Sequence, residues 1–260
     1  MSLDNRLEGR LALITGASGG IGSACARALW NNGMSLALTY SSNKPSLETL
    51  IAELESSNGE NSSRRRRQIS MHQVRLETDG DISSLFQDIQ AIHSHSPDVL
   101  IANAGYAKVI PRPEDITIEE FDRTISINLR STFLLVKDCL PYMIEQSWGR
   151  IVFISSIAAE GGGINGCHYA ASKAGMNGMM KNLATKLGRG EITVNSLAPA
   201  MIGDTGLIPD PKMLEGTPGD VKNIPVGRLG TPQECANVVE MICKTGYLTG
   251  QNILLSGGLR

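Results

Sequence analysis

Short apolar runs alternate with longer segments of helical periodicity along the whole chain. The longer segments carry apolar residues three and four positions apart, as amphipathic helices do; they include Pro45–Ser57, Ile82–Ile92, Ile118–Gln146 and Pro232–Lys244. The short runs predict buried strands at Leu11–Ile14, Ser35–Thr39, Met71–Leu76, Pro97–Ile101, Arg150–Ile154, Glu191–Leu197 and Asn252–Leu255. Strands that alternate with helices in this way predict an α/β fold whose parallel sheet is covered by helices on both faces.

Nothing in the sequence divides the chain into two parts. Its 260 residues, 41% of them hydrophobic, suffice for one sizeable core, and no linker interrupts the alternation. We therefore expect a single domain over residues 1–260. The one long irregular stretch, Met201–Pro225, is rich in Gly, Pro and Asp, and such stretches in compact domains are often lids or binding loops. We expect a substrate loop there, at about residues 200–225.

The bulk composition argues against nucleic acid, membrane and metal as partners. The formal net charge of −2 gives no overall electrostatic reason to bind nucleic acid or an anionic membrane. No apolar run reaches the roughly 18 residues of a membrane span. The chain enters its first strand almost at once, which leaves no room for a signal or transit peptide and favours a cytoplasmic protein. The cysteines lack CxxC or His-linked spacing and predict buried thiols in a reducing compartment; they are Cys25, Cys139, Cys167, Cys235 and Cys243.

A glycine-rich loop joins the first predicted strand to a helix. In Thr15–Gly22, Gly16 allows a tight turn, while Gly20 and Gly22 let the backbone approach a pyrophosphate and the helix pack closely on the strand. The amides at the start of that helix would face the phosphates, and the helix dipole favours negative charge there. The spacing is Gly-x-x-x-Gly-x-Gly, and its place between strand and helix predicts a dinucleotide site.

The end of the second predicted strand bears on the choice of dinucleotide. In dinucleotide folds an acidic residue at this point binds the ribose hydroxyls and repels a 2′-phosphate. Here the segment Tyr40–Lys44 offers the hydroxyls of Ser41 and Ser42, an amide and a lysine, and no acidic residue occurs before Glu48. We interpret this segment as a phosphate-binding edge that favours NADP(H) over NAD(H). The alternative is a polar turn that touches no ligand.

The candidate chemistry follows the fifth predicted strand. Arg150–Ile154 ends at Ser155 and Ser156, and ligands of α/β sheets usually bind at the carboxyl ends of the strands. Tyr169 and Lys173 stand four residues apart and share one face of a predicted helix. Because an ammonium beside a phenol favours the phenolate, we expect the pKa of Tyr169 to be lowered from about 10, so that it exchanges a proton near neutral pH.

Three further segments carry polar candidates. The small-residue turn Asn103–Gly105 follows the fourth predicted strand and can pass close under a bound nucleoside. Asn128 lies inside a long predicted helix, where asparagine is mildly unfavourable, so it is a candidate for binding other backbone or water. The run Arg64–Arg67 could address a nucleus, an acidic partner or a cofactor phosphate, although a solvated loop is the simpler interpretation.

Together these residues resemble the classical short-chain dehydrogenase/reductase family over essentially the whole chain. The matching pieces stand in the family's order and spacing: Thr15–Gly22, Asp98, Asn103–Gly105, Asn128, Ser156, Tyr169–Lys173 and Val194–Pro199. The resemblance implies a Rossmann-like, doubly wound sheet of seven parallel strands. It also implies hydride transfer between a nicotinamide cofactor and a carbonyl or alcohol.

The same resemblance implies a role for each site residue. Tyr169 is the proton donor, and Ser156 holds the substrate oxygen. Lys173 binds the nicotinamide ribose and lowers the pKa of the tyrosine, while Asn128 positions a proton-relay water. The expected cofactor-binding residues are Gly16, Ser18, Gly20, Ile21, Gly22, Tyr40, Ser41, Ser42, Asn103, Ala104, Gly105, Tyr169, Lys173, Pro199 and Ile202. The chain departs from the family pattern at positions that carry no catalytic group, namely Gly19, Arg75, Ala102 and Ala200.

Two segments near the C-terminus resemble one group within this family. Gly227–Pro232 and Tyr247–Gly258 are similar to 3-oxoacyl-(acyl-carrier-protein) reductases. That similarity implies NADPH-dependent reduction of a 3-oxoacyl thioester in fatty acid biosynthesis, acyl-carrier protein as a partner, and a homotetramer or homodimer. An enzyme for another alcohol or ketone (sugar, polyol, steroid or secondary metabolite) stays open. A dinucleotide-sensing protein without catalysis is the least favoured alternative.

Overall fold

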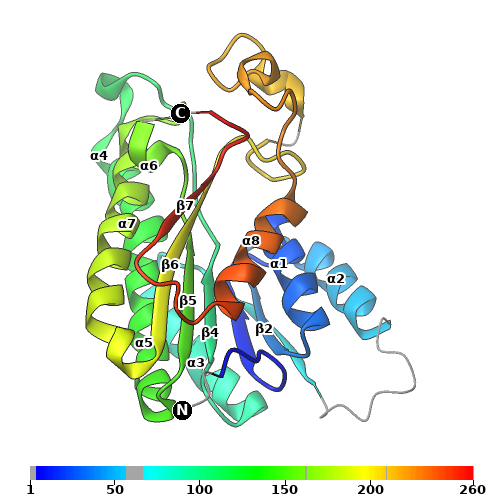
Figure 1. The fold of residues 1–260 in the computed structure, drawn as a ribbon. Coiled ribbons are helices and arrows are strands. Elements are labelled where there is room, and N and C mark those ends of the chain that lie inside the picture. Colours follow the sequence, from blue (N-terminus) through cyan, green and yellow to red (C-terminus); the bar gives the residue numbers. More distant parts are fainter. Residues whose placement is uncertain (1–3, 57–66, 162, 209, 260) are drawn as a thin grey trace.

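One sheet of seven parallel strands runs through the part of the chain that the structure describes (Figure 1). The computed structural model describes residues 4–56, 67–161, 163–208 and 210–259. The strands lie in the order β3-β2-β1-β4-β5-β6-β7. Their bounds are β1 Leu11–Ile14, β2 Ser35–Tyr40, β3 Ile69–Gln73, β4 Val99–Ala102, β5 Gly149–Ile154, β6 Ile192–Pro199 and β7 Asn252–Leu255.

Helices cover both faces of this sheet, each burying an apolar side in one of two core clusters. On one face pack α1 (Gly20–Asn31), α2 (Lys44–Ser56) and α8 (Pro232–Lys244). On the other face pack α3 (Asp79–His93), α5 (Ser131–Gln146) and α7 (Cys167–Leu187). The shorter α4 (Ile118–Ile125) and α6 (Ala158–Gly161) both contact α7. The predicted single-domain, doubly wound, Rossmann-like fold is confirmed.

The strand order reverses beside β1, and this positions the functional site. β1 pairs with β2 on one side and with β4 on the other, so the chain winds outward in both directions from this point. Ligands of open α/β sheets bind in the crevice that such a reversal leaves beyond the carboxyl ends of the strands. The glycine-rich loop after β1, the turn after β4 and the serines after β5 all lie at that edge.

Two predicted elements differ most from the structure. β3 begins two residues earlier than predicted and ends at Gln73. The polar Ser70 passes for a loop residue in the sequence, but it lies in a buried hydrogen-bonded cluster with His72 and His93. The single helix predicted over Ile118–Gln146 consists of α4, a π-helical turn and α5. π-helical turns inside helices often occur at functional sites.

The predicted substrate loop after β6 is irregular and contains the short 3₁₀ turns η4 (Pro211–Leu214) and η5 (Val221–Asn223). Of the arginine run, residues 64–66 lie outside the described residues. Arg67 stacks on Trp30, with its guanidinium carbon 4.0 Å from the ring centroid, and donates to the Trp30 carbonyl. No helix in the described part of the chain is long and apolar enough to cross a membrane.

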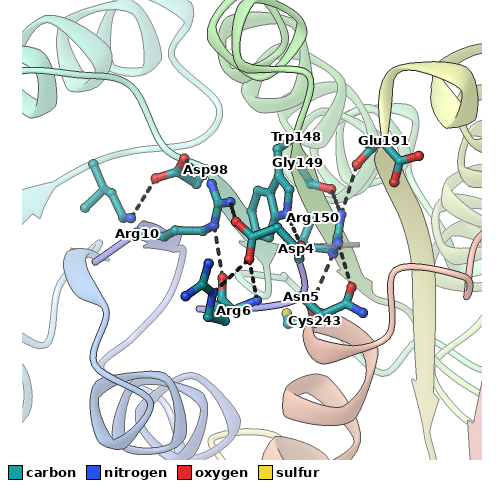
Figure 2. Close-up of polar contacts among 11 residues, drawn as sticks. Asp4, Asn5, Arg6, Arg10, Asp98, Trp148, Gly149, Arg150, Glu191 and Cys243 are labelled. Atoms are coloured by element: carbon teal, nitrogen blue, oxygen red, sulfur yellow. Dashed lines mark hydrogen bonds and ion pairs between the residues drawn. The ribbon is translucent and has the colours of Figure 1, made fainter. Parts of the chain in front are cut away.

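An arginine–tryptophan stack closes the opposite, amino-terminal edge of the sheet (Figure 2). The guanidinium carbons of Arg10 and Arg150 lie 3.5 Å and 4.3 Å from the centroid of Trp148. Arg150 is fully buried and donates to the carbonyls of Cys243 and Glu191, which holds the end of α8 against the sheet. This edge is therefore structural, and the ligand-binding edge lies at the other end of the strands.

Candidate functional site

The glycine-rich loop after β1 is packed so closely that no side chain fits at Gly20 or Gly22. Gly16 has a φ of +64°. A Cβ on Gly22 would lie 2.4 Å from the Gly16 carbonyl oxygen and 2.7 Å from Asn103 Nδ2. A Cβ on Gly20 would lie 2.3 Å from the carbonyl oxygen of Asp204, on the substrate loop. These glycines let the backbone form a turn that a bound dinucleotide can approach closely.

The start of α1 leaves its amides available to an anion. Gly19 occupies the N-cap position without a capping side chain, and the first turn holds no acidic residue. Unpaired amides and the positive end of the helix dipole favour phosphate at such an end. Ser18 is half-buried in the turn, and Ile21 is half-buried against the core. The residues present therefore fit the pyrophosphate of a dinucleotide.

Thr15 and Asn103 lock the ends of β1 and β4 together. The Thr15 hydroxyl accepts hydrogen bonds from the backbone amides of Asn103 and Ala104, each at 3.0 Å. In return, Asn103 Nδ2 donates to the carbonyls of Thr15 (2.8 Å) and Gly16 (3.2 Å). The Asn103 side chain thus fixes the shape of the glycine-rich loop. The role of the Thr15 hydroxyl was not predicted, and only its place at the carboxyl end of a strand hinted at it.

Asn128 lies in the π-helical turn (η2, Ser126–Arg130) and is fully buried. Its Oδ1 accepts from the Tyr106 amide (2.7 Å), and its Nδ2 donates to the Tyr106 carbonyl (2.9 Å) and to Ser172 Oγ (3.0 Å). Ser172 Oγ in turn donates to the Tyr169 carbonyl (2.7 Å). Asn128 therefore joins the segment after β4 to the helix that carries Tyr169.

Ser156, Tyr169 and Lys173 come together above β5. Ser156 lies close enough to the Tyr169 phenol to favour its ionised form, and its Oγ accepts from the Ala158 amide at 3.1 Å. Lys173 Nζ donates to the Ile154 carbonyl (2.8 Å) and lies 5.7 Å from the centroid of the tyrosine ring. A Cβ on Gly105 would lie 3.4 Å from Lys173 Nζ and 3.6 Å from Asn128 Oδ1, so the turn after β4 passes directly beside these groups.

The expected lowering of the pKa of Tyr169 was wrong for this structure. Burial raises the pKa of Tyr169 to about 12, because an apolar environment disfavours the phenolate; the effect of Ser156 acts in the opposite direction and is weaker. Burial also lowers the pKa of Lys173 to about 8, because it disfavours the ammonium. The lysine hydrogen bond goes to the Ile154 carbonyl, so the proximity on one helix face does not produce the predicted shift.

The segment after β2 combines buried and exposed groups. Tyr40 is buried, whereas Ser41 and Ser42 are exposed just before α2. Asn43 Oδ1 accepts from the Ser46 amide (3.3 Å) at the start of that helix. Lys44 Nζ forms a 3.1 Å ion pair with Glu48 in which both side chains are half exposed, so the amine stays accessible. The exposed hydroxyls of Ser41 and Ser42 and the Lys44 amine thus lie close together at the start of α2.

Pro199 and Ile202 connect the end of β6 to the substrate loop. Pro199 is the last residue of β6, and its carbonyl accepts from the Ile157 amide at 3.1 Å. Ile202 is buried and forms a bridge with Gly230, where the Gly203 and Gly230 amides donate to the carbonyls of Gly230 and Met201 at 3.0 Å each. The start of the loop is therefore fixed beside the glycine-rich turn.

Comparison with known proteins agrees with this geometry. The sequence profile described as short chain dehydrogenase matches residues 10–210. The chain belongs to the short-chain dehydrogenase family. It is therefore an NAD(P)-dependent oxidoreductase, as its family resemblance implied. Members of this family bind NADP(H) or NAD(H), so the cofactor is a nicotinamide dinucleotide.

Several relatives match this short-chain dehydrogenase over almost its whole length. It is 33% identical to a 3-oxoacyl-(acyl-carrier-protein) reductase from Rickettsia bellii, over 97% of this chain and 98% of that protein. It is 30% identical to a reductase of the same name from Aquifex aeolicus, over 99% and 100% of the two chains. Nodulation protein G from a Rhizobium species is 34% identical over 97% and 98%. A solved variant of a short-chain dehydrogenase/reductase from Serratia marcescens superposes with a TM-score of 0.85, at 27% identity over 98% and 99% of the two chains.

Proposed function

We propose that the protein reduces a 3-oxoacyl thioester to the 3-hydroxyacyl thioester with NADPH. The observation that carries the proposal is that Ser156 and Tyr169 lie side by side, with Lys173 one helical turn away, beside a turn shaped for a pyrophosphate. The end-to-end similarity to 3-oxoacyl-(acyl-carrier-protein) reductases supports the choice of substrate.

In this proposal each side chain has a defined task at the reacting carbonyl. The hydroxyls of Ser156 and Tyr169 both hydrogen-bond the substrate oxygen and polarise the carbonyl. Bound NADPH supplies the hydride to the carbonyl carbon. Tyr169 donates its proton to the oxygen as negative charge develops there; the raised pKa keeps its phenol protonated at neutral pH, which is the form that reduction needs. Lys173 binds the nicotinamide ribose and returns a proton to the tyrosine.

NADP(H) is the proposed cofactor because the segment after β2 offers donors and a cation where a 2′-phosphate would lie. Ser41 and Ser42 are exposed, and Lys44 stands at the start of α2. A helix start and a lysine both favour a phosphate over a free ribose hydroxyl. No acidic residue occurs between Tyr40 and Glu48, so no carboxylate in this segment repels the phosphate.

Acyl-carrier protein as the carrier of the substrate, and assembly into a homotetramer or homodimer, are part of the same proposal. Apolar side chains on α5 support the assembly: Phe133 is 50% exposed and Ile144 56% exposed. Large apolar groups gathered on one exposed helix are typical of contact surfaces. Light scattering on the purified protein measures the assembly directly, and a monomer at micromolar concentration would contradict it.

A reductase of another small ketone is the second candidate, because the 34% identity to a nodulation protein shows that equally similar relatives carry other names. Oxidation of NADPH with a panel of ketones separates the two. The proposal expects a higher kcat/KM with an acetoacetyl thioester than with a diketone, a quinone or a keto sugar, and a higher affinity for NADPH than for NADH. Turnover of simple diketones alone would overturn the thioester assignment, and absence of any turnover would leave a dinucleotide sensor.

A further inference from the structure

Helix α4 packs against α7 (Figure 1), and both helices carry buried polar atoms without a protein partner. Among the described residues, Glu120 Oε1, Thr124 Oγ1 and both ring nitrogens of His168 are buried and unpaired. Glu120 and Thr124 stand one turn apart on α4, and both Thr124 and His168 are fully buried. Buried polar atoms in native proteins nearly always have a partner, so this group of atoms indicates an additional bound molecule.

Glu120 also fastens the segment that follows Gly105. Its Oε2 accepts from Lys108 Nζ at 3.2 Å, and the Tyr106 hydroxyl lies close enough to help lower the pKa of the carboxyl group. Burial raises the pKa of Glu120, but the contacts with Tyr106 and Lys108, together with the nearby His168, outweigh burial and lower it. The carboxylate is therefore held as an anion within electrostatic range of His168.

The segment that Glu120 holds is part of the active-site wall. The Asn128 side chain hydrogen-bonds both the amide (2.7 Å) and the carbonyl (2.9 Å) of Tyr106. Further along, the Ile110 amide donates to the Asn165 carbonyl at 3.1 Å. Gly105, directly before this segment, lies against Lys173. The segment from Tyr106 to Ile110 thus extends from the catalytic lysine to the loop before α7.

The chemistry of the unpaired atoms specifies what joins them. A carboxylate oxygen only accepts hydrogen bonds, a hydroxyl donates and accepts, and a neutral imidazole donates once and accepts once. A direct bond between His168 and Glu120 would leave Thr124 unpaired. One water molecule, with two hydrogens to donate and two lone pairs, can bind all three side chains.

We propose that an ordered water joins Glu120, Thr124 and His168, and that Glu120 and His168 are positioning residues for the substrate. His168 directly precedes Tyr169, so this water connects the turn that carries the tyrosine to the wall that faces the substrate. Breaking the connection loosens the segment from Tyr106 to Ile110 but leaves the glycine-rich turn and Lys173 in place. The inference rests on the proposed roles of Tyr169 and Lys173, and on no particular ketone.

Steady-state kinetics on matched variants test this inference. Glu120→Ala and His168→Leu should raise the KM for the ketone about tenfold, which corresponds to the loss of about 1.4 kcal/mol of binding, with kcat and the Kd for NADPH within about twofold of wild type. His168→Gln should restore the KM, because an amide can donate and accept as the imidazole does. Glu119→Ala, an exposed carboxylate in the same helical turn, is the control for charge and should leave the KM unchanged.

A high-resolution crystal structure is the second test of this inference. It should show a water within about 3.2 Å of Glu120, Thr124 and His168. A direct imidazole–carboxylate contact without water, a normal KM in a folded Glu120→Ala variant, or an equal loss of NADPH affinity would each overturn the inference. If the wild-type protein reduces no ketone, the proposed function fails, whereas the crystal structure still decides the water site.

Discussion

Gly22→Ala should damage the glycine-rich turn far more than the neighbouring Gly19→Ala. The added methyl at Gly22 would lie 2.4 Å from the Gly16 carbonyl oxygen, 2.7 Å from Asn103 Nδ2 and 2.9 Å from Ala17 Cα. Two of these atoms belong to backbone, which cannot rotate away as a side chain can. At Gly19 the nearest atom is the Gly16 carbonyl at 3.4 Å and φ is −90°, so alanine fits without strain.

The size of the effect follows from the cost of overpacking. Forcing a methyl into a filled site costs about 1–3 kcal/mol, and backbone neighbours favour the upper end. About 3 kcal/mol lowers the melting temperature by roughly 6–12 °C in a domain of this size. The displaced Gly16 and Asn103 also carry the turn that faces the phosphates, so the Kd for NADPH should rise at least about tenfold, equivalent to about 1.4 kcal/mol.

Thermal melting followed by circular dichroism and titration of NADPH fluorescence measure both quantities on the two variants. Gly19→Ala should melt within about 2 °C of wild type, since no close contact opposes the methyl. The reasoning is refuted if Gly22→Ala melts as wild type does, or if the two variants lose the same stability and affinity. Either result would mean that the turn relaxes around a side chain, and that close packing is not what holds its shape.

Further predictions concern individual polar groups. Asn128→Ala removes three hydrogen bonds from a fully buried site and should lower the free energy of urea unfolding by about 3 kcal/mol; an undiminished value would show that these bonds do not hold the π-helical turn. Lys44→Met should raise the Kd for NADPH several-fold and leave that for NADH unchanged; an equal change for both cofactors would contradict the phosphate contact. Burial lowers the pKa of His93 to about 4, so below pH 6.5 the unfolded chain binds a proton that the folded chain does not. The free energy of unfolding should therefore fall from pH 6.5 towards pH 4, by up to about 1.4 kcal/mol per pH unit. Urea unfolding of His93→Gln should show a flatter slope.

The sequence predicted those parts of the fold that depend on local pattern. The predicted run Leu11–Ile14 is strand β1 and is buried throughout, so pattern and structure agree there. The start of β3 was misplaced because Ser70 is polar yet buried, and a group that satisfies it, His93, comes from the end of α3. A compensating hydrogen bond between distant segments leaves no trace in a local pattern.

The same limit applies to the site. The motif spacing predicted that Ser156, Tyr169 and Lys173 lie close together, and in the structure they do. The direction of the pKa shift at Tyr169 was missed because it depends on how completely the sheet and neighbouring helices bury the phenol, and helix-face proximity alone does not report burial. The unpaired buried atoms of Glu120 and His168 were missed because residues from two helices carry no shared motif.

The proton-donor role of Tyr169 is best tested with Tyr169→Phe, which removes the phenolic oxygen and keeps the ring. Tyr142→Phe, on α5, controls for the loss of a phenol elsewhere. For Tyr169→Phe, kcat/KM for the ketone should fall about 10²–10⁴-fold, the usual contribution of a general acid, while the Kd for NADPH stays within about threefold. A variant that binds NADPH normally and still reduces the ketone within tenfold of the wild-type rate would contradict Tyr169 as the proton donor.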